Sequence, residues 1–478
     1  MNEKPTKVEI WKFGGTSMKK IDEVANLIIE EKKQNKEKEL IVICSAFSRI
    51  TDFLSLFIER KDALSNKKER AKLIDKIKDI HQKIVKKSLK DSKNVAILEN
   101  TVIYQNISML EALNEIPALS AANKATALSI GEKLSCNILM ILLLEKGIDA
   151  HYIKPEDVIK TKDNDYFNAE IDIKKTQKAI LKTVIPKIDK NKVVIVPGFI
   201  GSNSQSFDNT VTLGRDGSDL SASIMGSVLK NIWSVSNYDF EITGVVIWTD
   251  VDGWFSANPE KIKNTTLINR LTYKEAQKLS TFGTKVLHQK AIPPAMLSNI
   301  KIVIKNTFNP HAEGTIIHNT PRKNRPLAGL TSKDCDIVTN ESPEMAGGTG
   351  YLYKIYEILY KENLPVDVIA TDETVVSSTI NPQPPERLGQ LVPVFDPIAS
   401  ASYITKCSII NLTGEGLKKT RQKQLEKILS LLNKEGIEMI MHSYPPKSIS
   451  IVFVIYKKDK QKVLQILHKE FFENPSIN

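Results

Sequence analysis

A lysine and two glycines follow the first strand-like segment of the chain. The motif Lys12-Phe13-Gly14-Gly15-Thr16-Ser17 ends an alternating segment and precedes a helix-periodic one. Paired glycines let backbone amides approach phosphate oxygens, and a lysine there can neutralise charge on a transferred phosphoryl group. A tight strand-to-helix turn with a surface lysine explains the same residues, and the motif taken alone favours that simpler interpretation.

A second polar motif combines an arginine with an aspartate. In Gly214-Arg215-Asp216-Gly217-Ser218-Asp219, the last two residues fall at or near the N-cap of a helical segment. Arg215 is suited to bidentate binding of a carboxylate, and Asp219 could orient Mg²⁺ or a catalytic lysine. An ordinary polar helix cap with two turn glycines explains the motif equally well.

Two further segments place polar groups at loop positions. Thr249 and Asp250 follow an apolar strand, and the carboxyl ends of strands in open α/β sheets are where ligands bind. A turn built from Asp and Gly is the simpler interpretation. In residues 282–288, a glycine and Lys285 precede His288, which we expect to be structural because no second histidine supports a triad or a metal site.

The elements that must position these residues alternate between strands and helices. Short apolar runs at residues 8–13, 40–44, 192–196, 245–248 and 300–304 are typical of strands buried in a parallel sheet, and long helical patterns separate them, including residues 67–89 and 125–146. The sequence therefore predicts an α/β fold with a mostly parallel central sheet sandwiched by helices.

The C-terminal third carries a duplicated pattern. A strand, a helix and two strands occur at residues 335–338, 351–362, 366–369 and 374–376, and again at 407–410, 421–434, 437–440 and 450–454, followed by a helix at 461–472. This order predicts two tandem ferredoxin-like α+β units, joined by a stiff proline-rich connector at residues 381–385.

Composition restricts the class of protein. The 478 residues are 41% hydrophobic and 26% charged, with a net charge of +11. About 150 residues per domain suggests roughly three domains. Cys44, Cys136, Cys335 and Cys407 show no metal or disulfide spacing, so a reducing compartment is expected. Neither a signal peptide nor an apolar run long enough for a membrane span is evident, which favours a cytoplasmic protein without a membrane partner.

The excess of lysine does not by itself indicate nucleic-acid binding. The lysine-dense residues 67–93 carry apolar residues at helical spacing, which is typical of a solvated helix face. Aromatic residues that could stack on bases do not interleave with these lysines. We therefore expect no nucleic-acid partner.

Taken together and in order, the motifs resemble those of aspartate kinases in the amino-acid kinase family. The matching residues are Lys12 to Ser17, the pair Gly131-Glu132, Gly214 to Asp219, residues 247–253 and residues 282–288. The resemblance extends to about residue 319 and continues into the repeats, which resemble paired ACT domains. It implies a catalytic domain at residues 1–325 and ACT domains at 326–395 and 396–478, which could interleave. Because the sequence ends at Asn478, a monofunctional enzyme is expected.

The resemblance implies ATP-dependent phosphorylation of the β-carboxylate of L-aspartate to 4-phospho-L-aspartate, with Mg²⁺. Lys12 would stabilise the transferring phosphoryl group, and Asp219 would hold Lys12 or the metal-bound phosphates in register. No set of protein residues is expected to ligate a metal. The aspartate-binding positions correspond to Ser45, Thr51, Glu132, Arg215, Gly217 and Ser218, with Arg215 on a carboxylate and Glu132 on the α-ammonium. The ATP-binding positions correspond to Lys12, Gly14, Gly15, Thr16, Ser17, Thr249, Asp250, Phe255, Lys261, Lys285 and Val286.

Some residues depart from the family pattern. Glu260 replaces an arginine that reaches ATP, and Lys261 could take its place. Gln289 stands where proline is usual, and extra residues lie near 233–238. A catalytically weak homologue acting as an amino-acid sensor, or a kinase for a related amino-acid carboxylate, therefore remains an alternative.

The resemblance also implies feedback regulation. Met345, Asp367, Thr371 and Glu373 correspond to positions that line the effector pocket of lysine-regulated relatives. An effector ammonium would suit the acidic residues, so lysine, or failing that threonine, is the expected effector. Repeats that serve only dimerisation are the alternative. Pairing of exposed sheet edges favours a homodimer or a higher homo-oligomer.

Overall fold

The computed structural model describes residues 5–59, 65–163, 165–188, 192–203, 209–235, 240–284, 286–320 and 327–473. The chain divides into two compact units: Met1–Trp254 with Val286–Asn319, and Phe255–Lys285 with Thr320–Asn478. The segment Phe255–Lys285, which the sequence analysis assigns to a domain of residues 1–325, thus belongs with the C-terminal unit. The boundaries of the two ACT domains stay a prediction.

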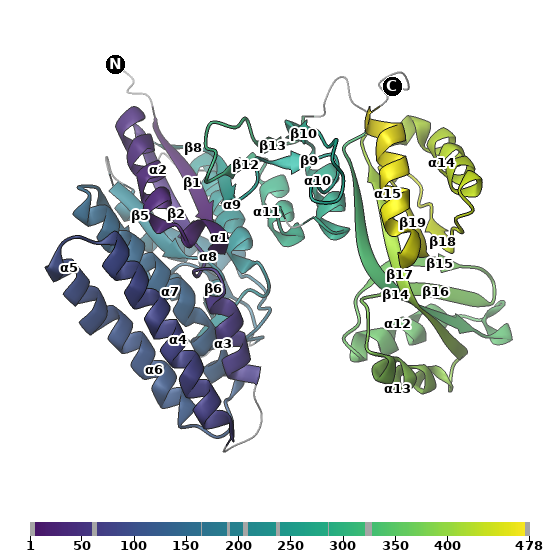
Figure 1. The fold of residues 1–478 in the computed structure, drawn as a ribbon, viewed down its shortest axis with the longest axis horizontal. Coiled ribbons are helices and arrows are strands. Elements are labelled where there is room, and N and C mark those ends of the chain that lie inside the picture. Colours follow the sequence, from purple (N-terminus) through teal and green to yellow (C-terminus); the bar gives the residue numbers. More distant parts are fainter. Residues whose placement is uncertain are drawn as a thin grey trace. The chain divides into compact units, whose positions relative to one another are not determined.

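A mostly parallel sheet forms the centre of the first unit, as predicted (Figure 1). The strands that this unit contributes lie in the order β13-β12-β8-β1-β2-β5-β3; β12 and β13 pair antiparallel, and the other pairs in this order are parallel. The bounds are β1 (Thr6–Phe13), β2 (Lys38–Cys44), β3 (Asp149–Tyr152), β5 (Lys192–Pro197), β8 (Phe240–Thr249), β12 (Ile302–Asn306) and β13 (Thr315–Ile317). All five predicted strands are confirmed, although β12 begins two residues later than expected.

Helices cover both faces of this sheet. On one face, the side chains of Trp11, Phe13 and Trp248 pack together with residues from α2, α3, α4 and α7. On the other face, Gly226 of α9 lies close to Ile10 and Val245. The helices of this unit are α1 (Gly15–Met18), α2 (Ile21–Gln34), α3 (Ile50–Glu59), α4 (Ser65–Ser88), α5 (Ser92–Ile97), α6 (Tyr104–Asn114), α7 (Ala121–Glu145), α8 (Ile173–Thr183), α9 (Gly217–Val235) and α11 (Ile292–Leu297). A small sheet consists of β4 (Lys160–Thr161), β6 (Ile200–Asn203) and β7 (Asn209–Thr212).

Helix α7 forms the centre of the helical layer. Among the described residues it alone is long and apolar enough to cross a membrane by length and composition, and 72% of its most apolar stretch is buried inside the protein. It contributes buried leucines, isoleucines and alanines to the core beside β2 and β5. Burial in the protein core accounts for this apolar composition.

The second unit contains a six-stranded antiparallel sheet in the order β15-β16-β14-β17-β19-β18. Its strands are β14 (Gly329–Glu341), β15 (Val366–Thr371), β16 (Val375–Ile380), β17 (Ser400–Thr413), β18 (Met441–Ser443) and β19 (Ser450–Tyr456). The helices are α12 (Tyr351–Lys361), α13 (Pro385–Phe395), α14 (Leu417–Lys434) and α15 (Lys460–His468). Shorter elements are β10 (Leu267–Ile268), β11 (Arg270–Leu271) and α10 (Tyr273–Thr281), and β9 (Trp254–Phe255) lies at the division between the units.

Two details of the predicted repeats are wrong. The strand expected at residues 437–440 begins only at Met441, because Gly436 takes a left-handed conformation and the amide of Ile437 donates back to the carbonyl of Leu432 at the end of α14. The proline-rich connector continues directly into α13, since Pro385 occupies the first helical position, where a missing amide hydrogen costs nothing.

Candidate active site

Lys12 and Asp219 form an ion pair at the carboxyl end of the central strand. The Lys12 Nζ lies 2.6 Å from the Asp219 Oδ1, and their side chains are 12% and 8% exposed. The amide of His288 donates to the other Asp219 oxygen over 3.2 Å. Residues from three distant motifs of the sequence thus meet at one point, and the lysine ammonium is held by a carboxylate that is itself fixed by a backbone hydrogen bond.

The glycines beside Lys12 create room for a ligand. A Cβ atom on Gly14 would lie 3.4 Å from the Lys12 ammonium, and one on Gly15 would lie 3.2 Å from the carbonyl oxygen of Ala46. A side chain at position 14 would therefore crowd the lysine, and one at position 15 would press against the loop after β2. Thr16 lines the adjacent cavity. Ser17, expected as a nucleotide contact, is buried and its hydroxyl hydrogen-bonds to the hydroxyl of Thr307 over 2.7 Å.

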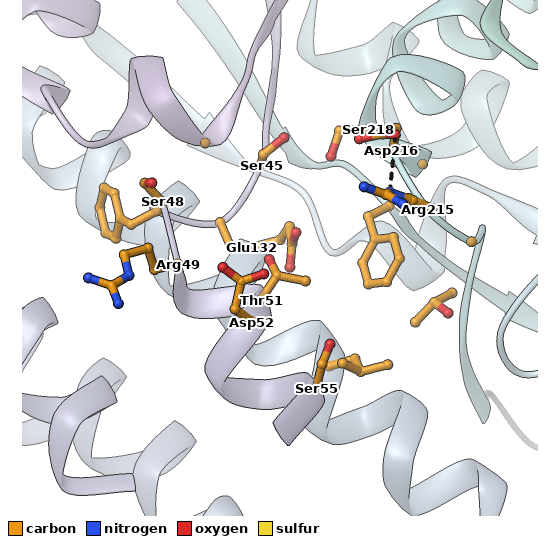
Figure 2. Close-up of a pocket in the computed structure, with 18 of the residues that line it drawn as sticks. Ser45, Ser48, Arg49, Thr51, Asp52, Ser55, Glu132, Arg215, Asp216 and Ser218 are labelled. Carbon is orange, nitrogen blue, oxygen red and sulfur yellow. Dashed lines mark ion pairs between the residues drawn. The ribbon is translucent and has the colours of Figure 1, made fainter. Parts of the chain in front are cut away.

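A cavity of about 620 Å³ opens next to these glycines (Figure 2). The loop after β2, the first half of α3, two positions of α7 and the loop before α9 contribute to its wall. All six residues expected to bind the substrate line it: Ser45, Thr51, Glu132, Arg215, Gly217 and Ser218. Figure 2 shows Glu132 between Arg215 on one side and Arg49 on the other, with the guanidinium of Arg49 directed away from Glu132.

Glu132 is the most unusual side chain in this cavity. It is 3% exposed, and its Oε2 has no hydrogen-bond partner within the described part of the chain. Burial raises the pKa of this carboxyl to about 8, although a backbone hydrogen bond from Ala46 partly opposes that effect. A buried acceptor without a partner is costly, so its retention at a cavity wall indicates a ligand that supplies a donor.

The neighbouring glycine explains how Glu132 reaches the cavity. A Cβ atom on Gly131 would lie 2.7 Å from the Ala46 Cβ and 3.0 Å from a methyl of Ile50. Only glycine therefore lets α7 pack this closely against the loop that ends in α3. Because of this close approach, the carboxylate of Glu132 lies at the wall of the cavity.

Arg215 presents a cation at the opposite wall. Its side chain is 89% exposed, and its closest ionic partner is Asp216 at 3.9 Å. The guanidinium is thus available to a ligand carboxylate. Asp216 has φ of 55°, and Arg49 and Phe199, which also line the cavity, have φ of 71° and 68°. Such conformations are strained for residues other than glycine and concentrate at functional sites.

Several further residues line the cavity without having been expected there from the sequence: Ser48, Arg49, Asp52, Ser55, Leu128, Phe167, Phe199 and Thr212. Asp52 and Ser55 could have been found, since they lie one helical turn apart on the same helix as Thr51. Phe167, Phe199 and Thr212 carry no local signal, because tertiary packing alone brings their segments to the cavity.

The residues expected to contact the nucleotide fall into three groups. Thr249 and Asp250 lie where β8 ends, next to Gly14, whose amide donates to the carbonyl of Trp248 over 3.3 Å. Val286 belongs to the same compact unit. Phe255 and Lys261 belong to the other unit, as does Glu260, and Lys285 lies outside the described residues.

Two departures from the family pattern also have a place in the structure. Gln289 begins a short 3₁₀ helix, and the extra residues 233–235 extend α9, whereas 236–238 lie outside the described residues.

A second cavity, of about 520 Å³, lies in the C-terminal unit. Met345, Thr371 and Glu373 line it, together with Asp372, three glycines and residues of α12. Asp367, expected in the same pocket, does not line it. Its carboxylate instead pairs with the ammonium of Lys333 at 2.5 Å, a lysine on β14, which is separated from β15 by β16 in the sheet.

Comparisons with known proteins identify the family. A model of the amino acid kinase family matches residues 7–306, and an ACT domain model matches residues 410–471. Aspartokinase 1 (chloroplastic) of Arabidopsis thaliana is 28% identical over 98% of this chain and 81% of its own length. Lysine-sensitive aspartokinase 3 of Escherichia coli K12 is 27% identical over 98% of this chain and its entire length.

Solved structures agree with this match. Escherichia coli aspartokinase III in complex with aspartate and ADP (R-state) superposes with a TM-score of 0.82 at 25% identity, covering 97% of this chain and 100% of that one. The same enzyme in complex with lysine and aspartate (T-state) gives 0.76 at 26% identity, covering 97% and 99%. The expected resemblance to aspartate kinases with ACT domains is thereby confirmed, and the chain belongs to the amino acid kinase family, as a kinase similar to aspartokinases over nearly its whole length.

Proposed function

We propose that this protein transfers the γ-phosphoryl group of ATP to the β-carboxylate of L-aspartate, giving 4-phospho-L-aspartate for the pathway to lysine, threonine and methionine. The observation that carries the proposal is that Glu132 and Arg215 both line one cavity. An unpartnered buried carboxylate suits an α-ammonium, and an exposed guanidinium suits a carboxylate. The complex of a relative with aspartate and ADP supports both substrates.

The chemistry requires positioning and charge stabilisation from the protein. An oxygen of the substrate β-carboxylate attacks the γ-phosphorus, and the bond to the oxygen that leaves with ADP breaks, so no protein nucleophile is needed. Lys12 would stabilise the negative charge on the transferring group, while Asp219 keeps its ammonium in place. The open backbone of Gly14 and Gly15 leaves room for the phosphates.

The residues present fit a magnesium ion carried by the nucleotide. The described residues contain no group of three acidic, histidine or cysteine side chains that could hold a metal, so Mg²⁺ would be held mainly by phosphate oxygens and water, and Asp219 beside Lys12 could contribute a carboxylate. When bound, the ion would neutralise charge on the phosphates.

An assay of product formation tests the proposal. Purified protein, Mg-ATP and L-aspartate are incubated with hydroxylamine, which converts the acyl phosphate to a coloured hydroxamate. We expect hydroxamate with L-aspartate and much less with L-glutamate. No product from any amino acid would favour the sensor alternative, and preferential reaction of glutamate would favour a kinase for a related carboxylate.

We further propose that the C-terminal cavity binds lysine as a feedback inhibitor. Glu373 and Asp372 supply negative charge for an ammonium beside Thr371 and Met345. The complex of the E. coli relative with lysine and aspartate supports this choice over threonine. Calorimetry with lysine and with threonine shows which of the two binds. If neither binds saturably, the repeats have only an assembly role.

Assembly and location follow as proposals from the same family. Strands β15 and β18 form the edges of the six-stranded sheet, and pairing of such edges would produce a homodimer or larger homo-oligomer. Sedimentation of the full chain tests this.

We place the enzyme in the cytoplasm, where ATP and free aspartate are available, and microscopy of a tagged full chain tests that location.

A further inference from the structure

A third cavity, of about 400 Å³, lies at the opposite edge of the central sheet from the Lys12–Asp219 pair. Its wall is built where the parallel strands begin: Lys7 on β1, Glu241 to Thr243 on β8, Asn299 to Lys301 before β12, and His318 after β13, with Lys230 contributed by α9. None of these residues belongs to the substrate cavity or to the expected nucleotide site. The cavity is therefore a separate feature of the first unit.

Positive charge is in excess around this cavity. Lys7, Lys230 and Lys301 line it, against the single carboxylate of Glu241. Within the described part of the chain, none of these four side chains forms an ion pair, although Glu241 occupies the position directly opposite Lys7 in the pairing of β1 with β8. Lys38, in contrast, is paired with both Glu9 and Glu31.

Backbone and aromatic packing hold two of the lysines in place. A Cβ atom on Gly244 would lie 2.8 Å from the Cγ of Lys301 and 3.0 Å from its Cε, so the aliphatic stem of the lysine packs directly on that glycine. The carbonyl of Lys301 also accepts a hydrogen bond from the amide of Val245 over 2.9 Å. The Lys230 ammonium lies 4.2 Å from the ring centre of Trp233. Such anchoring reduces the entropy lost when the cations bind a ligand.

We infer that this cavity binds a small polyanion that carries phosphate or carboxylate groups. Three ammonium groups around one space supply donors and charge for several oxyanions, and the side-chain amide of Asn299 adds a neutral polar group at the wall. Because the carboxylate of Glu241 repels anions and offsets one of the three lysine charges, a ligand with at least two negative charges matches the cavity best. The inference does not depend on the proposed kinase reaction.

Lysine footprinting of the full chain tests the inference at single sites. The protein is reductively methylated with and without inorganic tripolyphosphate, or with citrate as the carboxylate arm, and the modification of each lysine is measured by mass spectrometry. We expect Lys7, Lys230 and Lys301 to be protected about fivefold or more, with the protection decreasing at high salt. Protection of Lys12 is read separately, so binding of tripolyphosphate at the nucleotide site is not mistaken for binding here.

Two sets of variants complete the test. In K7Q/K301Q, protection of Lys230 should disappear, whereas E241Q should strengthen it, and K83Q/K87Q, which changes two exposed lysines on α4, should leave it unchanged. Protection by tripolyphosphate alone assigns phosphate as the preferred group, and protection by citrate alone assigns carboxylate. Failure of both anions to protect the three lysines in the wild type, or undiminished Lys230 protection in K7Q/K301Q, overturns the inference.

Discussion

The raised pKa of Glu132 predicts how the affinity for aspartate depends on pH. The carboxyl has a pKa of about 8 in the empty cavity, so near neutral pH only about one molecule in ten carries the carboxylate that an α-ammonium requires. Each unit of pH below this pKa costs about 1.4 kcal/mol in the binding of the ammonium. The KM for L-aspartate should therefore fall about tenfold per unit as the pH rises toward 8, and should level off above it.

Substitution of Glu132 tests whether the ionisation of its carboxyl causes the pH dependence of KM. In E132Q the amide cannot ionise, so the steep dependence of KM on pH should vanish. Loss of a charge-assisted hydrogen bond costs about 1.5–3 kcal/mol, which corresponds to a KM roughly ten- to a hundredfold higher where the wild type is fully ionised. S55A, which removes a neutral hydroxyl from the same cavity, is the matched control and should keep the wild-type dependence.

Initial rates with varied L-aspartate at saturating Mg-ATP, measured from about pH 6 to about pH 9, give the KM values. A wild-type KM that stays constant over this range would refute the assignment of Glu132 to the ammonium. An E132Q enzyme that retains the full dependence would refute it equally, because another group would then control binding.

Particular contacts give four further predictions. E132Q should stabilise the ligand-free protein at pH 7 by up to about 3 kcal/mol, because the carboxyl of Glu132 ionises above its ordinary pKa of 4.5 in the unfolded chain but stays protonated to about pH 8 in the folded one. Urea unfolding should show that this gain in the free energy of unfolding disappears at about pH 4, and a variant less stable than the wild type at pH 7 would contradict the prediction. K12M should lower kcat by a factor of about a thousand with little change in KM for aspartate, whereas K87M on α4 should be neutral; equal effects of the two in steady-state assays would exclude a special role for Lys12. G131A should cost about 1–3 kcal/mol in thermal unfolding and raise the KM for aspartate, because its methyl would meet Ala46 at 2.7 Å; wild-type stability would show that α7 can shift freely. E373Q should weaken lysine binding about tenfold by calorimetry, while D367N, whose carboxylate is paired with Lys333, should change it by less than about threefold; the reverse order would place the effector beside Asp367.

Much of the catalytic unit can be predicted from the sequence because its signals are local. Continuous apolar runs indicate the buried parallel strands, and glycines indicate the turns at their carboxyl ends. Since these ends meet at one edge of a sheet, Lys12 and Thr249 are expected near one another without knowledge of the strand order. Arg215 and Glu132 can be assigned to substrate only through the resemblance, because a cap arginine and a helix glutamate carry no distinctive local pattern.

The features that the sequence did not predict depend on packing between distant segments. The exposed or buried state of Glu132 depends on Gly131 allowing close contact with Ala46, and no helical periodicity encodes that contact. Asp367 has the charge expected of an effector ligand, yet Lys333, two strands away in the sheet, forms an ion pair with it. Phe199 lines the substrate cavity from a left-handed conformation that only the folded loop imposes.

The central claim is that the ammonium of Lys12 stabilises phosphoryl transfer from ATP to an oxygen of aspartate bound between Glu132 and Arg215. Incubation with Mg-ATP and L-aspartate in the presence of hydroxylamine, which displaces phosphate from the acyl phosphate and leaves a hydroxamate that is quantified, measures that event directly. Our account predicts L-aspartate hydroxamate from the wild type and almost none from K12M under the same saturating conditions. Hydroxamate formed equally well by both proteins, or by neither, would contradict it.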